Sequence, residues 1–106
     1  MSDPLFNQGK AKVKKVKESS VEDRVVAYAR NKGWFVAKVN FPGIRGAADR
    51  LFIGHGVTMF MEFKRPKGGK VSPLQLRFKD KMHAQKVSVW FVHNAEEGKT
   101  LLDGYL

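Results

Sequence analysis

Two stretches of the chain repeat apolar residues at the spacing of a helix. In the first, Ser19-Ser20-Val21-Glu22 matches a capping box and Gly33 is a natural stop. The second begins at Ser72-Pro73-Leu74-Gln75, where a serine cap, a proline at the first helical position and a glutamine three residues after the serine coincide. The predicted buried stripes are Val21, Val25, Val26, Tyr28 and Ala29 in the first helix and Leu74, Phe78 and Met82 in the second.

Short runs of β-branched and aromatic residues predict four strands, at residues 34–39, 51–53, 57–63 and 87–92. The sequence Gly54-His55-Gly56 predicts a tight hairpin between the second and the third. Glycine, proline and lysine mark residues 40–46 and 65–71 as loops, and residues 94–106 form a tail or a short helix. The order αβββαβ predicts an α/β domain with a mixed sheet and two main helices.

Composition narrows the class of protein. With 106 residues and 42% apolar content, the chain suffices for one compact domain. The N-terminus lacks the pattern of a signal peptide and no run is long enough for a membrane span, so we expect a cytoplasmic protein without a membrane partner. Cysteine is absent, which excludes disulfides and thiolate metal sites.

The charge points to a polyanionic partner. Twenty Lys and Arg against ten Asp and Glu give a formal net charge of +10, which favours a nucleic-acid partner. The alternative is a ribosome-associated or merely soluble basic protein. Five lysines crowd into residues 10–17, so we expect residues 1–18 to be a flexible basic N-terminal arm and residues 19–106 to be the folded domain. The alternative for the arm is a solvated tail without a role.

Three charged side chains at the strand ends are the candidate chemistry. Glu62 and Lys64 point to the same face of their strand because strand side chains alternate. If His55 and Gly56 are the two turn residues, Asp49 lies opposite Glu62, and like charges there are destabilising unless a cation lies between them. Two carboxylates suit Mg²⁺ or Mn²⁺. If the turn centres on His55 alone, Asp49 faces Met61 and the argument weakens.

Simpler interpretations exist for each of these residues. Edge strands often carry charges as protection against aggregation, which would explain Glu62 and Lys64 without chemistry. Asp49 can be an ordinary turn residue before a strand. A lysine beside a metal site, in contrast, can stabilise negative charge that develops on a phosphate.

The ordered motifs resemble those of a known family. Gly46-Ala47-Ala48-Asp49, a hairpin, Met61-Glu62-Phe63-Lys64, a basic glycine loop and Ser72-Pro73-Leu74-Gln75 are similar to the virus-type replication-repair nuclease (VRR-Nuc) domain of the PD-(D/E)XK superfamily. The resemblance covers residues 19–93 and implies a restriction-endonuclease-like αβββαβ core with a mixed central sheet flanked by helices. One departure is Ala48, where the superfamily name has proline.

The resemblance also implies roles for individual residues. Asp49, Glu62 and the main-chain carbonyl of Phe63 would be the metal ligands, and Lys64 would be the catalytic lysine. Gln75 and Glu22 would complete the catalytic set, although each also stands three residues after a serine, where a capping-box partner belongs.

The expected function is metal-dependent endonuclease cleavage of DNA, on branched substrates such as four-way (Holliday) junctions. The alternatives are a non-catalytic nucleic-acid-binding module of the same fold, or a nuclease acting on flaps or DNA ends. Basic residues around the two loops are the candidate phosphate contacts, namely Arg45, Arg50, Arg65, Lys67, Lys70 and Arg77.

We also expect a homodimer, because a four-way junction needs two symmetric cuts and this domain offers one site. Phe41, Ile44 and the apolar C-terminus are candidate interface residues: Leu101, Leu102, Tyr105 and Leu106. The alternative is that these side chains pack onto their own domain.

Overall fold

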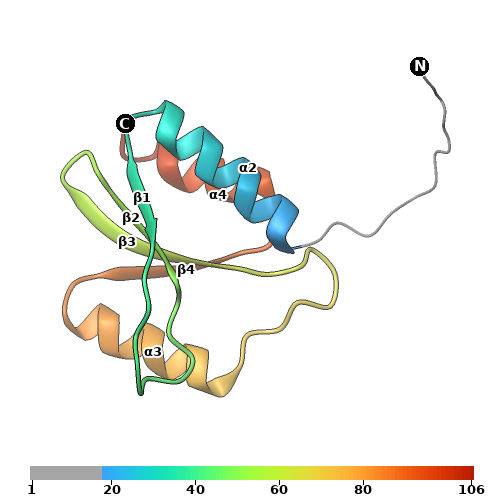
Figure 1. Ribbon diagram of the computed structural model, residues 1–106, viewed down its shortest axis with the longest axis vertical. Coiled ribbons are helices and arrows are strands. Elements are labelled where there is room, and N and C mark those ends of the chain that lie inside the picture. Colours follow the sequence, from blue (N-terminus) through green and yellow to red (C-terminus); the bar gives the residue numbers. More distant parts are fainter. Residues whose placement is uncertain (1–17) are drawn as a thin grey trace, which may run out of the picture.

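The computed structural model describes residues 18–106, so most of the predicted basic arm lies outside the described residues. Figure 1 shows a four-stranded sheet between helices. The elements in chain order are α2 (Glu18–Asn31), β1 (Phe35–Lys38), β2 (Arg50–Gly54), β3 (Val57–Phe63), α3 (Pro73–Ala84), β4 (Ser88–Val92) and α4 (Ala95–Asp103). The predicted order is confirmed, and residues 94–106 contain a short helix. No helix within this part of the chain is long and apolar enough to cross a membrane.

The sheet is mixed, with strand order β1-β2-β3-β4. β1, β2 and β3 pair antiparallel, and β4 lies parallel to β3. Positive φ angles at His55 (50°) and Gly56 (78°) fit a two-residue primed turn between β2 and β3. The ladder ends at Arg50 opposite Met61. The next pair in this register is Asp49 and Glu62, as predicted.

Two apolar layers cover the two faces of the sheet. α2 and α4 lie side by side over one face, and α3 lies over the other (Figure 1). Alternation along β3 serves both layers: Met59, Met61 and Phe63 belong to the cluster beneath α2 and α4, whereas Phe60 packs with Phe78 of α3. Glu62 and Lys64 follow Phe60 in this alternation, so their side chains leave the end of β3 on the α3 face.

The start of the first helix differs from the prediction. The chain is already helical at Glu18, which the sequence pattern assigns to the arm, and Ser19 lies within α2. A residue inside a helix cannot act as its N-cap, because the cap lies outside the helical backbone. The capping box predicted at Ser19 and Glu22 is therefore wrong.

Most of the expected interface residues pack onto their own domain. Leu102 is fully buried in the core beneath α4, with Leu101 and Tyr105 packed against it. The Phe41 ring packs on Phe60 and Phe78, with ring centroids 5.7 and 5.4 Å away. Of the expected set, Ile44 and Leu106 remain exposed.

Candidate active site

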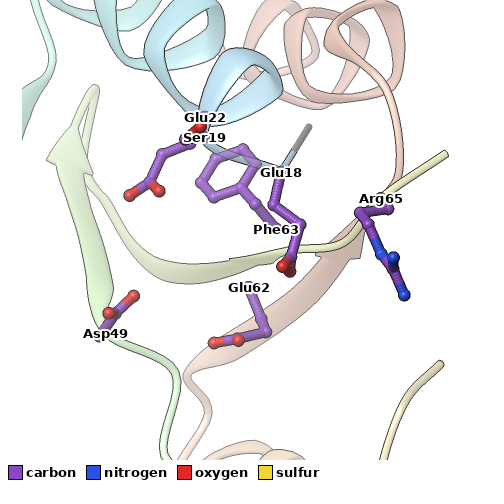
Figure 2. A pocket seen from close by; sticks show the side chains of 7 residues that line it. All are labelled: Glu18, Ser19, Glu22, Asp49, Glu62, Phe63 and Arg65. Carbon is purple, nitrogen blue, oxygen red and sulfur yellow. The ribbon is translucent and has the colours of Figure 1, made fainter. Parts of the chain in front are cut away.

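Asp49 and Glu62 line one cavity at the ends of β2 and β3. The cavity has a volume of about 480 Å³, and Figure 2 shows the two carboxylates turned toward each other across it. Glu18 and Glu22 face the same space from the first turns of α2, and Arg65 extends away from it. The remaining lining residues are Ser19 and Phe63. The structure therefore brings together the three predicted metal-binding positions, Asp49, Glu62 and Phe63.

The environment of Glu62 raises the pKa of its carboxyl group, mainly through burial. Burial raises the pKa of the Glu62 carboxyl from 4.5 to about 7, and the charge of Asp49 adds to the rise. Lys64 opposes it, whereas Glu18 and Glu22 contribute in the same direction as Asp49. Glu62 thus lies near three other carboxyl groups in a half-buried site, where the binding of a positive charge is favourable.

Lys64 is held close to Glu62 by Gln75 at the start of α3. The Lys64 ammonium donates to Gln75 Oε1 at 2.7 Å, and Gln75 Nε2 donates to Glu62 Oε2 at 3.3 Å. Lys64 is only 8% exposed, and its main-chain N–H donates to the carbonyl of Val92 at 2.8 Å. One glutamine thus orients both charged side chains of the Glu-x-Lys pair.

The same glutamine also caps its helix. The Ser72 side chain accepts from the Gln75 N–H at 3.1 Å, and Gln75 Oε1 accepts from the Ser72 N–H at 2.9 Å. This is the predicted capping box, with Pro73 following the cap. The two roles that the sequence left as alternatives for Gln75 are therefore compatible, because its carbonyl oxygen accepts two hydrogen bonds.

Two glycines bring the loops close to these residues. Gly46 has a φ of 79°, and a Cβ at this position would lie 2.5 Å from the main-chain carbon of Leu74, so the loop before Asp49 rests on the first turn of α3. Gly69 packs on the main chain of Arg65, where a Cβ would lie 2.6 Å from the carbonyl oxygen and 2.9 Å from Cβ of Lys64. Only glycine allows both close approaches.

Glu22 has a partner that the sequence did not indicate. Arg50 donates to Glu22 Oε2 through Nε at 2.8 Å, and its NH2 nitrogen lies 2.7 Å from the same oxygen. The two side chains are 12% and 19% exposed, so this ion pair between α2 and β2 is largely shielded from water. Arg50 is thus committed to Glu22, unlike the other predicted phosphate contacts, which are exposed: Arg45, Arg65, Lys67, Lys70 and Arg77.

The donor set at the cavity suits a hard divalent cation. Its protein ligands would be oxygen atoms from Asp49, Glu62 and the Phe63 carbonyl, which is the chemistry that Mg²⁺ and Mn²⁺ prefer. Within residues 18–106 no group of three or more His, Cys, Asp and Glu side chains is arranged to hold a metal ion. A cation here would depend on the main-chain oxygen together with water or substrate.

Sequence reasoning missed Glu18 and the Arg50–Glu22 ion pair. Glu18 lies one residue outside the predicted domain, but its spacing of four residues from Glu22 would place both on one helix face once the helix is extended. No local signal joins Arg50 to Glu22, because they are 28 residues apart and meet only when α2 packs on the sheet.

Comparisons with known proteins find a relative by sequence and a similar solved structure. The protein named "Putative nuclease p44", from Acyrthosiphon pisum secondary endosymbiont phage 1, is 40% identical over 63 residues, which are 58% of this chain and 67% of that protein. A solved structure described as a "VRR_NUC domain" matches with a TM-score of 0.75 and 27% sequence identity, over 84% of this chain and 97% of that one. No family model matches the chain. The structural match spans nearly all of the solved domain, so the two chains share one arrangement of helices and strands.

Proposed function

The chain belongs to the VRR-Nuc family of nucleases, and on this premise we propose that it is a metal-dependent DNA endonuclease selective for branched structures. The observation that carries the proposal is the arrangement of Asp49 and Glu62 in one cavity, with Lys64 held beside Glu62 by Gln75. The carboxylates of Asp49 and Glu62 are suited to bind a cation, and the fixed ammonium of Lys64 is suited to contact a phosphate.

Each side chain has a distinct task in this proposal. Asp49, Glu62 and the Phe63 carbonyl would hold Mg²⁺ or Mn²⁺, and such an ion lowers the pKa of bound water and neutralises phosphate charge. Lys64 keeps its ammonium at a fixed position, where it stabilises the charge that develops on the scissile phosphate. Gln75 orients Lys64 and Glu62, and Glu22 acts through Arg50 by fixing α2 against β2.

Phosphates outside the cavity would be held by the exposed basic residues around it. Arg45, Arg65, Lys67, Lys70 and Arg77 are available for this contact, whereas Arg50 is neutralised by Glu22. Residues 1–17 contain five lysines and would add a sequence-independent contribution to binding. Deleting them should weaken binding and reduce its salt dependence, and binding unchanged at every salt concentration would show that they have no such role.

The decisive experiment is cleavage of labelled duplex, flap, splayed and four-way DNA with Mg²⁺, with Mn²⁺ and with EDTA. Asp49→Asn, Glu62→Gln and Lys64→Ala should abolish cleavage and leave DNA binding largely intact, because the exposed basic residues remain. Glu96→Gln removes a carboxylate on the exposed face of α4 and should cleave normally. Full cleavage by a carboxylate variant, or in excess EDTA, would reject the assignment.

We propose a homodimer as the working unit on a four-way junction. Two cuts related by symmetry require two sites, and a two-fold dimer supplies them from one sequence. The relative from a phage fits a protein that works in the cytoplasm of a bacterial host. Light scattering at micromolar concentration measures the oligomer, and a monomer that cuts both junction strands together would contradict the dimer.

A further inference from the structure

Large exposed apolar side chains fall into two groups on the described surface. Phe35 of β1 and Ile53 of β2 are cross-strand partners near the β2–β3 turn, and are 61% and 41% exposed. Ile44 and Leu76 are 50% and 47% exposed, and both belong to segments that lead into the candidate active site. Leu106 is the last residue of the chain. The two groups have similar exposure, but only the second lies on segments that carry residues of the candidate site.

Ile44 and Leu76 flank the close contact between Gly46 and Leu74. Ile44 is two residues before Gly46, and Leu76 is two residues after Leu74, so both belong to the segments that meet at this contact. Each is followed directly by an exposed arginine, Arg45 or Arg77. The surface thus combines two aliphatic side chains with two guanidinium groups.

The loop that carries Ile44 is fixed at both ends. The Ile44 N–H donates to the carbonyl of Phe41 at 3.1 Å, and Gly43 has a φ of 79°, so residues 41–44 form a tight turn with proline at its second position. Phe41 is anchored by ring contacts to Phe60 and Phe78. Ile44 is therefore presented to solvent by a well-supported turn, and its exposure cannot be relieved by a small shift of the loop.

We propose that Ile44 and Leu76 pack against unstacked bases at the branch point of the DNA, while Arg45 and Arg77 contact the adjacent phosphates. This inference rests on the proposed nuclease function and names the contact that gives it selectivity for branched DNA. Proteins insert Ile and Leu side chains between base steps, and in a stacked duplex this insertion costs the energy of unstacking. At a branch point the stacking is already interrupted, so the same contact costs less there than in a fully stacked duplex.

The position of these side chains links branch recognition to cleavage. Leu76 directly follows Gln75, which holds Lys64 and Glu62, and Ile44 is joined to Asp49 by the loop that rests on α3. A branch point held by Ile44 and Leu76 would fix the distance along the DNA between the branch and the scissile phosphate. Loss of the contact should therefore make the cut position less uniform as well as weaken binding.

The test compares binding of a four-way junction and a duplex of the same sequence, each with 2-aminopurine at the branch position, in EDTA to prevent cleavage. Wild-type protein should raise the fluorescence of the junction by unstacking the probe. Ile44→Ser with Leu76→Ser should lower the preference for junction over duplex by about tenfold, the size expected for loss of a buried aliphatic contact, and abolish the fluorescence rise. The salt dependence should not change, since both arginines remain.

Ile53→Ser with Phe35→Ser is the matched control, because it removes equally exposed apolar side chains away from the site, and it should bind like the wild type. Equal loss on junction and duplex, no loss at all, or conversion of a dimer to a monomer by the Ile44 and Leu76 changes would overturn the inference. If the wild type cleaves DNA and the variant with Ile44→Ser and Leu76→Ser keeps its preference for the junction, this inference alone is refuted. If the wild type binds no DNA, the proposed function is refuted as well.

Discussion

Two helices of this domain carry the same start pattern, and only one of them uses it. Ser72 and Gln75 at α3 form both hydrogen bonds of a capping box, whereas Ser19 lies inside α2 and Glu22 binds Arg50. The pattern is a serine followed three residues later by a residue with a long polar side chain. Whether the pattern forms a capping box therefore depends on which groups the polar side chain at its end contacts in the folded domain.

Two physical differences account for the outcomes. Pro73 has no N–H and a fixed φ, so α3 begins there, whereas nothing in residues 18–22 stops the helix at Ser19. A glutamine side chain both donates and accepts, so Gln75 serves the cap and Lys64 through its oxygen and Glu62 through its nitrogen. A glutamate can only accept, and Glu22 is paired with the nearby guanidinium instead.

Among variants that test the comparison of the two helix starts, the largest effect should come from removing the Gln75 side chain, which serves both functions. Gln75→Ala releases Lys64 and Glu62, so we expect cleavage to slow by about 10- to 100-fold, as is typical when a supporting hydrogen bond to a site is lost. DNA affinity should change little. Gln85→Ala, at the other end of α3, should cleave normally. Single-turnover rates measure the effect, and an unchanged rate for Gln75→Ala would mean that Lys64 is positioned without it.

Arg50 should matter for stability and not for binding. Arg50→Ala leaves the Glu22 carboxylate largely buried without its partner, which should lower the free energy of unfolding by about 1.5–3 kcal/mol. Urea denaturation measures this loss, and Glu22→Gln completes a double-mutant cycle. The exposed pair of Lys99 and Glu96 is the control, where Glu96→Gln should cost less than about 0.5 kcal/mol. A lower salt dependence of DNA binding in Arg50→Ala would show that Arg50 contacts phosphate after all.

Alanine substitutions of Ser72 and Ser19 should differ in their effect on the stability of the domain. Ser72→Ala removes an N-cap acceptor and should destabilise the domain by about 1 kcal/mol. Ser19→Ala replaces a serine inside a helix by the best helix former, so its effect should be within about 0.5 kcal/mol. Equal losses in the two variants, measured by urea denaturation, would mean that α2 begins at Ser19 in solution.

The smallest effect is a dependence of stability on pH at Glu62, the residue that Gln75 contacts. Its pKa is raised from 4.5 to about 7, so the folded state binds this proton more tightly than the unfolded chain. The resulting stabilisation is complete below about pH 4.5 and is lost as the pH rises through 7. Because Glu62 is partly exposed, the change should stay below about 1 kcal/mol.

Glu62→Gln tests this dependence, since it cannot titrate. In EDTA, its melting temperature relative to wild type should rise between pH 4.5 and pH 8. A constant difference over this range would show that the pKa of Glu62 is not raised in the folded state. Addition of Mg²⁺ at pH 8 should stabilise the wild type more than the variant, as expected for a ligand that binds only the folded form.

The sequence predicts the parts of this fold that depend on neighbours along the chain. Alternation along β3 separates Met59 and Met61 from Phe60, and the His55–Gly56 turn sets the register that brings Asp49 opposite Glu62. The α3 start is equally local, since Ser72, Pro73 and Gln75 lie within four residues. These local features are also the ones that assemble the candidate site.

What could not be predicted depends on packing between distant segments. The burial of the apolar residues 101, 102 and 105 is explained only when α4 lies beside α2. Leu106 is the apolar residue of this C-terminal group that stays exposed. Phe41 is partly buried only because its ring packs on Phe60 and Phe78. Arg50 is indistinguishable in sequence from the phosphate-binding candidates around it, and only the approach of α2 gives it a carboxylate partner.

The end of the β2–β3 ladder predicts an order in which the site comes apart. Glu62 remains paired with Phe91 of β4, while Asp49 lies beyond the last β2–β3 pair and its carbonyl accepts one hydrogen bond, from Val39 at 2.8 Å. Amide hydrogen exchange should therefore be faster around Asp49 than along the middle of β3, because local opening costs less where fewer neighbours hold the chain. If local opening at Asp49 precedes melting of the domain, activity should fall on heating before the global transition and return on cooling, because Glu62 stays paired in the sheet.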